Sequence, residues 1–161
     1  MIQFAAWTGL RQGELFGLHR ADVTEYEIQV RRSRKLDGSL GLPKNGTTRS
    51  VPLLPPARVL DQVPSRHESP FLFHSPQGKP LLKGTHAWSW NKVKASAGVE
   101  TRWHDLRHFC ATQLLELGLD HFAVSIQLGH TDGGALVMAH GNFAGRRPSQ
   151  ASISTTRSLR V

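Results

Sequence analysis

Two basic residues spaced for one face of a helix, His104 and Arg107, are the first candidates for chemistry. A helix start carries partial positive charge and free N–H groups, so it attracts an anion. An imidazole and a guanidinium that converge there could hold a phosphate and exchange protons with it. The alternative is that both side chains only cover the exposed face of an amphipathic helix.

Three other basic residues could contribute to the same kind of site. Arg11 lies between two glycines, Gly9 and Gly13. Because glycines let a backbone approach a ligand closely, Arg11 could point at that ligand, with Glu14 orienting it from one turn away. Lys44 lies on a loop between two predicted strands and could swing its charge into a groove, and His130 follows a predicted helix end. Alternatively, Arg11 and Glu14 form an exposed pair, Lys44 is solvated and His130 is structural.

The spacing of apolar side chains predicts the elements that must position these residues in the first half of the chain. Alternating residues favour strands, and a regular three-to-four spacing favours helices. We expect helical segments over 4–7 and 14–18, strands within 22–32 and 48–53, a turn at 37–38, a short helix over 55–63 and an extended piece over 70–73.

Three helices are predicted in the second half. The first, over 84–97, is expected to turn Trp88, Val93 and Ala97 inward. The last, over 121–128, has Asp120 as its N-cap, and a final apolar piece covers 135–139. The clearest helix, 104–117, is expected to bury Leu106, Phe109, Cys110, Leu114 and Leu117. Together, the predicted elements indicate an α+β, mainly helical domain with a small antiparallel sheet over 27–53, near its N-terminus.

The charge balance indicates a polyanionic partner. The chain has 161 residues, with 20 Lys and Arg against 12 Asp and Glu, and its sequence pI is about 10.6. Basic residues gather in 31–35 and in the acid-free segment 145–161. A small basic domain without an apolar run long enough to cross a bilayer most often meets nucleic acid, although a basic face can also serve solubility alone.

Cysteine content and the opening residues indicate the compartment. Cys110 is the single cysteine, which excludes an internal disulfide framework and favours a reducing cytoplasm. The first fifteen residues lack the charged start and long apolar stretch of a secretion signal.

Taken in order, the motifs resemble one known family. They are TGLRQGEL at 8–15, PK at 43–44, RSVPL at 49–53, HDLRH at 104–108 and LGH at 128–130. This series resembles the tyrosine recombinase and phage integrase family over about residues 3–143. The stretch HTDGGALVM at 130–138 is similar to integrases from phages and mobile elements of high-GC bacteria.

The resemblance implies an integrase-like catalytic domain that performs metal-free phosphoryl transfer on double-stranded DNA, with no cofactor. Arg11 and Arg107 match the two arginines that clamp the scissile phosphate in the family. Lys44 matches the hairpin lysine that protonates the leaving 5′ oxygen, and His104 and His130 match the two assisting histidines. Other recombinase protomers, assembled as a tetramer at synapsis, are the implied protein partners.

Two departures from the family pattern affect the expected activity. The family's nucleophilic tyrosine should lie about ten residues past His130, but 139–143 reads AHGNF and the only tyrosine, Tyr26, is far away in the sequence. One explanation is that a lost codon or a frameshift removed this tyrosine, which would also explain the structureless C-terminal tail. The other is that His140 acts as the nucleophile. The resemblance also leads us to expect that the chain starts inside the catalytic domain, without the family's helical core-binding domain. We therefore expect a partial catalytic domain over 1–143, a disordered basic tail over 144–161, and impaired recombination.

Three other functions remain open from the sequence. The first is a non-catalytic DNA-binding remnant that uses the same cationic groove. The second is a metal site built from His104, His108, Cys110 and His130, although Cys110 is predicted on the apolar face, away from the other ligands. The third is a helix-turn-helix regulator formed by residues 10–18.

Overall fold

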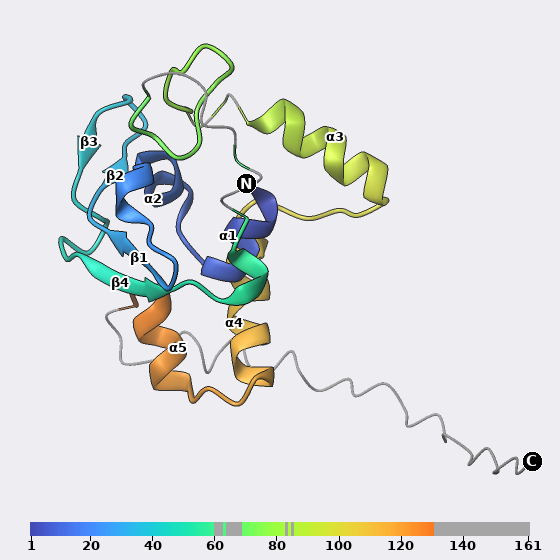
Figure 1. Cartoon of the computed structure of the whole chain (residues 1–161). Helices are drawn as coiled ribbons and strands as arrows, with labels where there is room; N and C mark the ends of the chain where they lie inside the picture. Colours follow the sequence, from blue (N-terminus) through green and yellow to red (C-terminus); the bar gives the residue numbers. More distant parts are fainter. Residues whose placement is uncertain (60–62, 64–68, 83, 85, 131–161) are drawn as a thin grey trace, which may run out of the picture.

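The computed structural model describes residues 1–59, 63, 69–82, 84 and 86–130. Within them, a mainly helical body carries short antiparallel strands on one side (Figure 1), which confirms the α+β expectation. The elements in chain order are α1 (Ile2–Thr8), α2 (Gln12–Gly17), η1 (Arg20–Asp22), β1 (Glu27–Val30), β2 (Ser33–Arg34), β3 (Leu40–Gly41), β4 (Arg49–Pro52), η2 (Pro55–Ala57), α3 (Ala87–Ala97), α4 (Asp105–Glu116) and α5 (His121–Leu128).

The strands form two antiparallel pairs within the described residues. β1 pairs with β4, where Ile28 faces Val51 and both side chains are buried. β2 pairs with β3 across a turn in which Gly38 has a positive φ of 86°. The antiparallel pairing predicted over 27–53 is confirmed, but these strands form two separate two-stranded sheets instead of one. The β1–β4 pair contributes to the core, and the β2–β3 hairpin is more exposed.

A close packing contact fixes where α1 ends. Gly9 ends this helix in the left-handed conformation, with φ 64°. A Cβ on Gly9 would lie 2.4 Å from the Leu128 side chain and 3.1 Å from Cys110 Sγ. Only glycine meets both demands without strain, because it has no Cβ and tolerates positive φ. The loop that follows α1, which carries Arg11, therefore lies against the C-terminal end of α5.

The boundaries of α4 and α5 follow their capping residues. α4 begins at Asp105 with His104 as its N-cap, one residue later than predicted. The Asp120 side chain accepts a hydrogen bond of 2.7 Å from the backbone N–H of Ala123, so the predicted cap of α5 is confirmed. Gly118 follows α4 with a φ of 89°, a backbone conformation that ends helices.

The buried face of α4 differs from the predicted one. Cys110 and Leu114 are buried as expected, but Phe109 and Leu117 are exposed. The buried residues of this helix are Arg107, Cys110, Ala111 and Leu114. They follow the usual helical spacing. Viewed around the helix, Arg107 lies in the middle of this buried face. Because the prediction counted only apolar residues, it left Arg107 out and placed the buried face about one residue position away around the helix.

The predicted inward face of α3 is wrong. Trp88, Val93 and Ala97 are all exposed, with 72% of Trp88 accessible to solvent. Trp90 is the buried residue of this helix, and its ring lies 5.3 Å from that of Trp103 in an edge-to-face contact. α3 therefore projects from the body in Figure 1 and is attached through aromatic contacts near its start.

Other elements in the first half are shorter than predicted. The strand expected within 22–32 is preceded by η1, because the Asp22 carboxylate accepts a 3.0 Å hydrogen bond from His19 N–H and caps that turn. The extended piece over 70–73 makes a single bridge, between Phe71 and His19. η2 ends at Ala57, well before the predicted end.

The main core lies between the first two helices, the β1–β4 pair and the segment around Leu72. Its largest fully buried side chains include Phe4, Leu15, Ile28 and Leu72. A second cluster joins α4 to α5 through Cys110, Leu114, Val124 and Leu128. No helix among the described residues has the length and apolarity needed to cross a bilayer.

Candidate functional site

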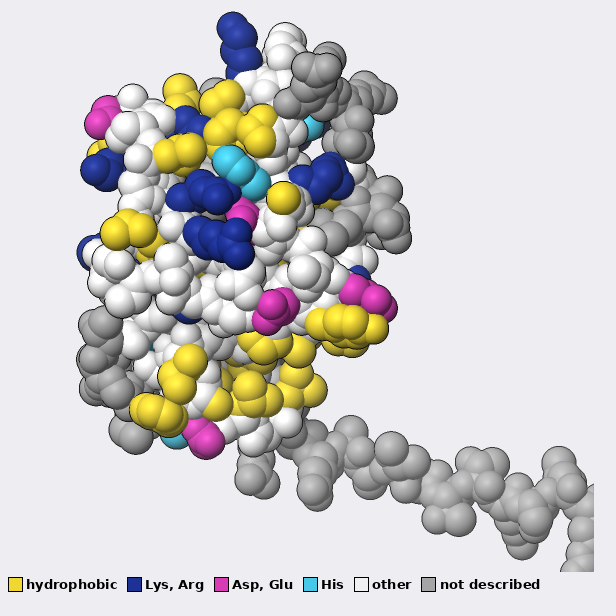
Figure 2. Space-filling model, turned by 60° about the vertical axis from the view of Figure 1, so that its left-hand side comes forward, with side chains coloured by type: hydrophobic (Ala, Val, Ile, Leu, Met, Phe, Trp, Pro, Cys, Tyr) yellow, Lys and Arg dark blue, Asp and Glu magenta, His cyan; other side chains and the backbone are white. Residues whose placement is uncertain are grey.

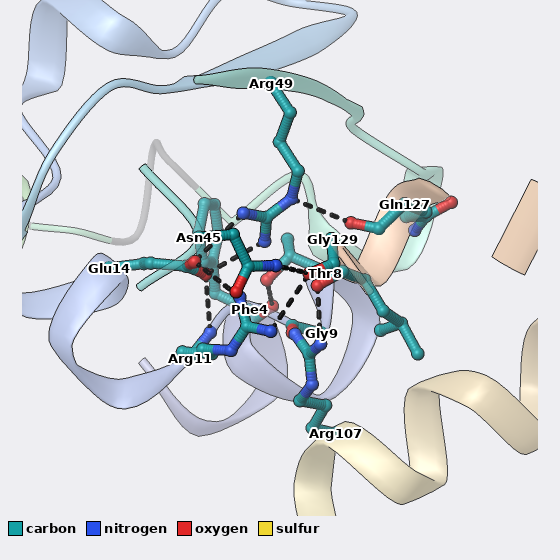
Figure 3. A network of polar contacts seen from close by, with 11 residues as sticks. Phe4, Thr8, Gly9, Arg11, Glu14, Asn45, Arg49, Arg107, Gln127 and Gly129 are labelled. Atoms are coloured by element: carbon teal, nitrogen blue, oxygen red, sulfur yellow. Dashed lines mark hydrogen bonds and ion pairs between the residues drawn. The ribbon is translucent and has the colours of Figure 1, made fainter. Parts of the chain in front are cut away.

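Glu14 is the shared acceptor of the site. This α2 residue is only 1% exposed, and its carboxylate receives two hydrogen bonds of 2.9 Å from the Arg49 guanidinium. Arg11 donates to the same carboxylate through its backbone N–H, at 2.8 Å, and through Nη1, at 3.2 Å. Burial alone would raise the pKa of Glu14, but the bonds and charges of Arg49 and Arg11 outweigh it and lower that pKa. Glu14 is therefore ionised and holds both arginines (Figure 3).

Arg11 and Arg107 converge on the C-terminal end of α5. Arg11 Nη2 donates a 3.0 Å hydrogen bond to the carbonyl oxygen of Gly129. Arg107 donates to the carbonyl oxygen of the preceding residue, Leu128, and at 2.6 Å to that of Gly9. The structure therefore brings together two guanidiniums that are far apart in the sequence, as Figure 3 shows.

Positive charge is in excess at this point. Arg107 is 5% exposed, and its hydrogen-bond acceptors given above are neutral carbonyls. Burial, and then the charge of Arg11, lowers its pKa to about 10, so it stays protonated at neutral pH. Arg11 and Arg49 bond to one carboxylate, that of Glu14, and Arg107 feels the charge of that carboxylate without bonding to it. A buried cation with neutral acceptors favours an incoming anion, because that anion supplies the missing counter-charge.

The two predicted histidines lie at the edges of this cluster. His104 caps α4, and burial, then the charge of Arg107, lowers its pKa. Because this pKa lies below the ordinary value of 6.5, the His104 imidazole is neutral at pH 7. His130 directly follows Gly129, whose carbonyl Arg11 holds, and its backbone N–H donates to Ser125 at 3.0 Å. Both predicted positions therefore lie next to the arginine pair.

Lys44 lies at a cavity of about 810 Å³ beside α2. The Lys44 side chain is exposed, and it lines this cavity together with Arg11. The next residue, Asn45, donates a 2.7 Å hydrogen bond to the Gly129 carbonyl that also accepts from Arg11. The charged residues lining the cavity are Arg11, Arg34, Lys35, Asp37 and Lys44. Lys and Arg side chains also gather beside a histidine in the middle of the face in Figure 2.

Sequence comparison identifies the family to which this chain belongs. The profile of the phage integrase family matches residues 1–138. The chain belongs to that family. It is 32% identical over 142 residues to the integrase of Mycobacterium phage L5, a match that covers 78% of this chain and 38% of the phage protein. It is also 32% identical over 146 residues to the tyrosine recombinase XerD of Shewanella oneidensis, covering 82% of this chain and 45% of that protein.

Solved structures share the fold of this integrase-family chain. The Tn1549 transposon integrase in complex with a circular intermediate DNA superposes with a TM-score of 0.73 at 21% identity, covering 86% of this chain and 52% of that one. A lambda integrase dimer bound to a core site gives 0.69 at 17% identity, covering 95% and 54%. The chain therefore spans about half the length, or less, of the relatives it matches.

Two residues of the site, Arg49 and Asn45, were not predicted from the sequence. Arg49 belongs to the RSVPL motif, but its role as the second partner of Glu14 depends on the register of β4 against β1. Asn45 depends on a turn that brings its loop back to α5. Arg49 belongs to a quoted motif and Asn45 directly follows one, but the contact that gives each residue its role is with a residue distant in the sequence.

The other predicted sites have different outcomes. Among the residues that the structure describes, no group of three His, Cys, Asp or Glu is placed to hold a metal ion, so the alternative metal set is not assembled there. The helix-turn-helix alternative does not fit α2, because this helix has only six residues and four consecutive ones, 14–17, are buried, which leaves no exposed face for recognition. His140, the AHGNF stretch, the apolar piece over 135–139 and the tail over 144–161 lie outside the described residues.

Proposed function

We propose that this chain binds the sugar–phosphate backbone of double-stranded DNA as part of a site-specific recombination protein, with one phosphodiester held by Arg11 and Arg107. The observation that carries the proposal is the convergence of these two guanidiniums on consecutive carbonyl groups, Gly129 and Leu128, where Glu14 holds Arg11 in place. Each guanidinium has five N–H donors and uses only some of them on protein acceptors. The remaining donors suit the two non-bridging oxygens of a phosphate.

The same cluster supports a cleavage and rejoining reaction without a metal ion. A nucleophile on the protein attacks phosphorus, the bond to the 5′ oxygen breaks, and a 3′-phosphoprotein linkage stores the bond energy for rejoining. Lys44 gives its proton to the leaving 5′ oxygen. His104 and His130 hydrogen-bond the phosphate and exchange protons with the reacting groups. The arginines neutralise the charge that develops on the phosphate oxygens.

The missing tyrosine nucleophile limits this reaction. Tyr26 is exposed and precedes β1, and the sequence has no tyrosine in the segment that follows His130. We propose that the chain retains DNA binding and that strand cleavage is impaired. The alternative is a non-catalytic DNA-binding remnant that has no cleavage machinery at all.

Recombination also needs partner protomers, and we propose that this chain meets other recombinase subunits on DNA. Lambda integrase, which shares the fold, forms a tetramer bound to a Holliday junction. Multivalent binding of that kind raises the overall affinity for DNA without any new contact in one subunit.

A trapping experiment separates the impaired enzyme from the remnant. The chain is mixed with a nicked suicide duplex, and covalent adducts are counted on a denaturing gel. We expect no adduct from the unmodified chain and an adduct from His140→Tyr, because this change supplies a nucleophile about ten residues past His130. His140→Phe is the matched control and should give none. DNA binding by His140→Tyr without any adduct would favour the remnant.

A further inference from the structure

One polar contact beside the proposed site is not used by any of the roles above. Gln12 directly follows Arg11 and lines the same cavity as Arg11 and Lys44. Its amide nitrogen lies 2.7 Å from Nε2 and 3.2 Å from Nδ1 of His86. His86 is the N-cap residue of α3 and is only 7% exposed. The contact therefore joins the start of α2, next to Arg11, to a buried ring 74 residues away.

Aromatic neighbours fix the orientation of that ring. The ring of Phe16 lies 5.1 Å from the ring of His86, and the ring of Trp103 lies 4.7 Å from it, both edge to face. Trp103 packs in turn against Trp90 of α3. A ring held from two sides cannot turn without disturbing its neighbours, so its nitrogen atoms keep a constant direction.

We propose that Gln12 contacts the DNA strand beside the phosphate held by Arg11, and that His86 is the positioning residue that orients its amide. The inference rests on the proposed function, because it requires DNA in the cavity. A primary amide has two N–H donors and one carbonyl acceptor. When one N–H is directed at His86, the other N–H and the carbonyl oxygen remain for phosphate, sugar or base atoms in the cavity.

The neutral charge of Gln12 makes its contribution distinguishable from that of Arg11. Each phosphate neutralised by a cation releases counterions, so the affinity for DNA falls linearly with salt on a logarithmic scale. Loss of one cationic phosphate contact reduces that slope by about one. Loss of a neutral contact weakens binding at every salt concentration and leaves the slope unchanged.

The test measures binding of the full chain to a mixed-sequence duplex of about 30 base pairs, by fluorescence anisotropy over a range of salt. We expect Gln12→Ala and His86→Phe each to weaken binding by about 5- to 10-fold with the slope unchanged. Phenylalanine retains the ring contacts with Phe16 and Trp103 but offers no acceptor to Gln12. The double variant should bind no more weakly than the weaker single variant, because both changes remove the same contact.

Two controls accompany these variants. His74→Phe changes a histidine that contacts the Ser75 carbonyl instead of Gln12, and should bind like the unmodified chain. Arg11→Ala should weaken binding and also reduce the salt slope. The inference is overturned when Gln12→Ala binds normally, when its slope falls as that of Arg11→Ala does, or when the two single effects add. In each of these cases a loss with Arg11→Ala leaves the proposed function standing. Failure of the unmodified chain to bind duplex would overturn the proposed function itself.

Discussion

Arg49 and Glu14 face each other through two parallel hydrogen bonds, from Nη1 to Oε1 and from Nη2 to Oε2, each 2.9 Å long. This two-pronged contact is the strongest geometry available to an arginine and a carboxylate. It ties strand β4 to helix α2, while the same carboxylate also orients Arg11. Arg49 further donates from Nε to the carbonyl oxygen of Gln127, at 3.1 Å, so it holds the end of α5 as well.

Removing Arg49 should therefore destabilise the fold. We expect Arg49→Met to lower the free energy of unfolding by about 3–5 kcal/mol, because a buried carboxylate loses its main partner. Urea-induced unfolding measures this change. The matched control is Arg58→Met, whose guanidinium bonds to the Leu53 carbonyl and lies over the Tyr26 ring, and should cost about 1 kcal/mol or less. Similar losses for the two variants would contradict the role given to Arg49.

Acid should weaken the same contact. The pKa of Glu14 is lower in the folded chain than its ordinary value of 4.5, so the folded state binds this proton less readily than the unfolded state does. The resulting stabilisation is fully present above that ordinary value and is lost as the pH falls through the folded pKa. We expect the free energy of unfolding to drop between neutral pH and about pH 3, and to drop less in Glu14→Gln. Parallel pH profiles for the two proteins would show that Glu14 is not a source of acid sensitivity.

Gly9 should tolerate no side chain. Its φ of 64° disfavours any other residue, and a Cβ would lie 2.4 Å from the Leu128 side chain. We expect Gly9→Ala to lower the free energy of unfolding by about 2–3 kcal/mol. Gly98→Ala isolates the backbone contribution, because Gly98 has a φ of 63° with nothing within 4 Å of its Cβ position, and should cost about 1 kcal/mol. Equal losses at the two glycines would mean that contact with α5 does not matter.

Local signals in the sequence predicted much of the fold. The Asp120 cap, the turn at Gly38 and the antiparallel pairing over 27–53 all depend on short stretches of chain, and the structure confirms them. The positions of Arg11 and Arg107 were recognised through motif order. Their convergence on the end of α5 could not be derived from spacing, because it depends on how α1, α4 and α5 pack together.

Burial of polar residues explains the main errors. Arg107 lies at the centre of the buried face of α4, so a prediction based on apolar residues turned Phe109 inward instead. In α3, the choice between Trp88 and Trp90 depended on Trp103, a distant residue that packs against only one of them. The shared carboxylate of Glu14 was proposed only as a partner of Arg11, because nothing local indicates that Arg49 reaches it from β4.

The central claim is that Arg11 and Arg107 hold one and the same phosphodiester. A crystal structure of the chain with duplex DNA tests it most directly. We expect a single backbone phosphate within about 3 Å of nitrogen atoms of both guanidiniums, with His104 and His130 at its sides. Phosphates that contact the two arginines separately, or a duplex bound to another face of the molecule, would contradict it.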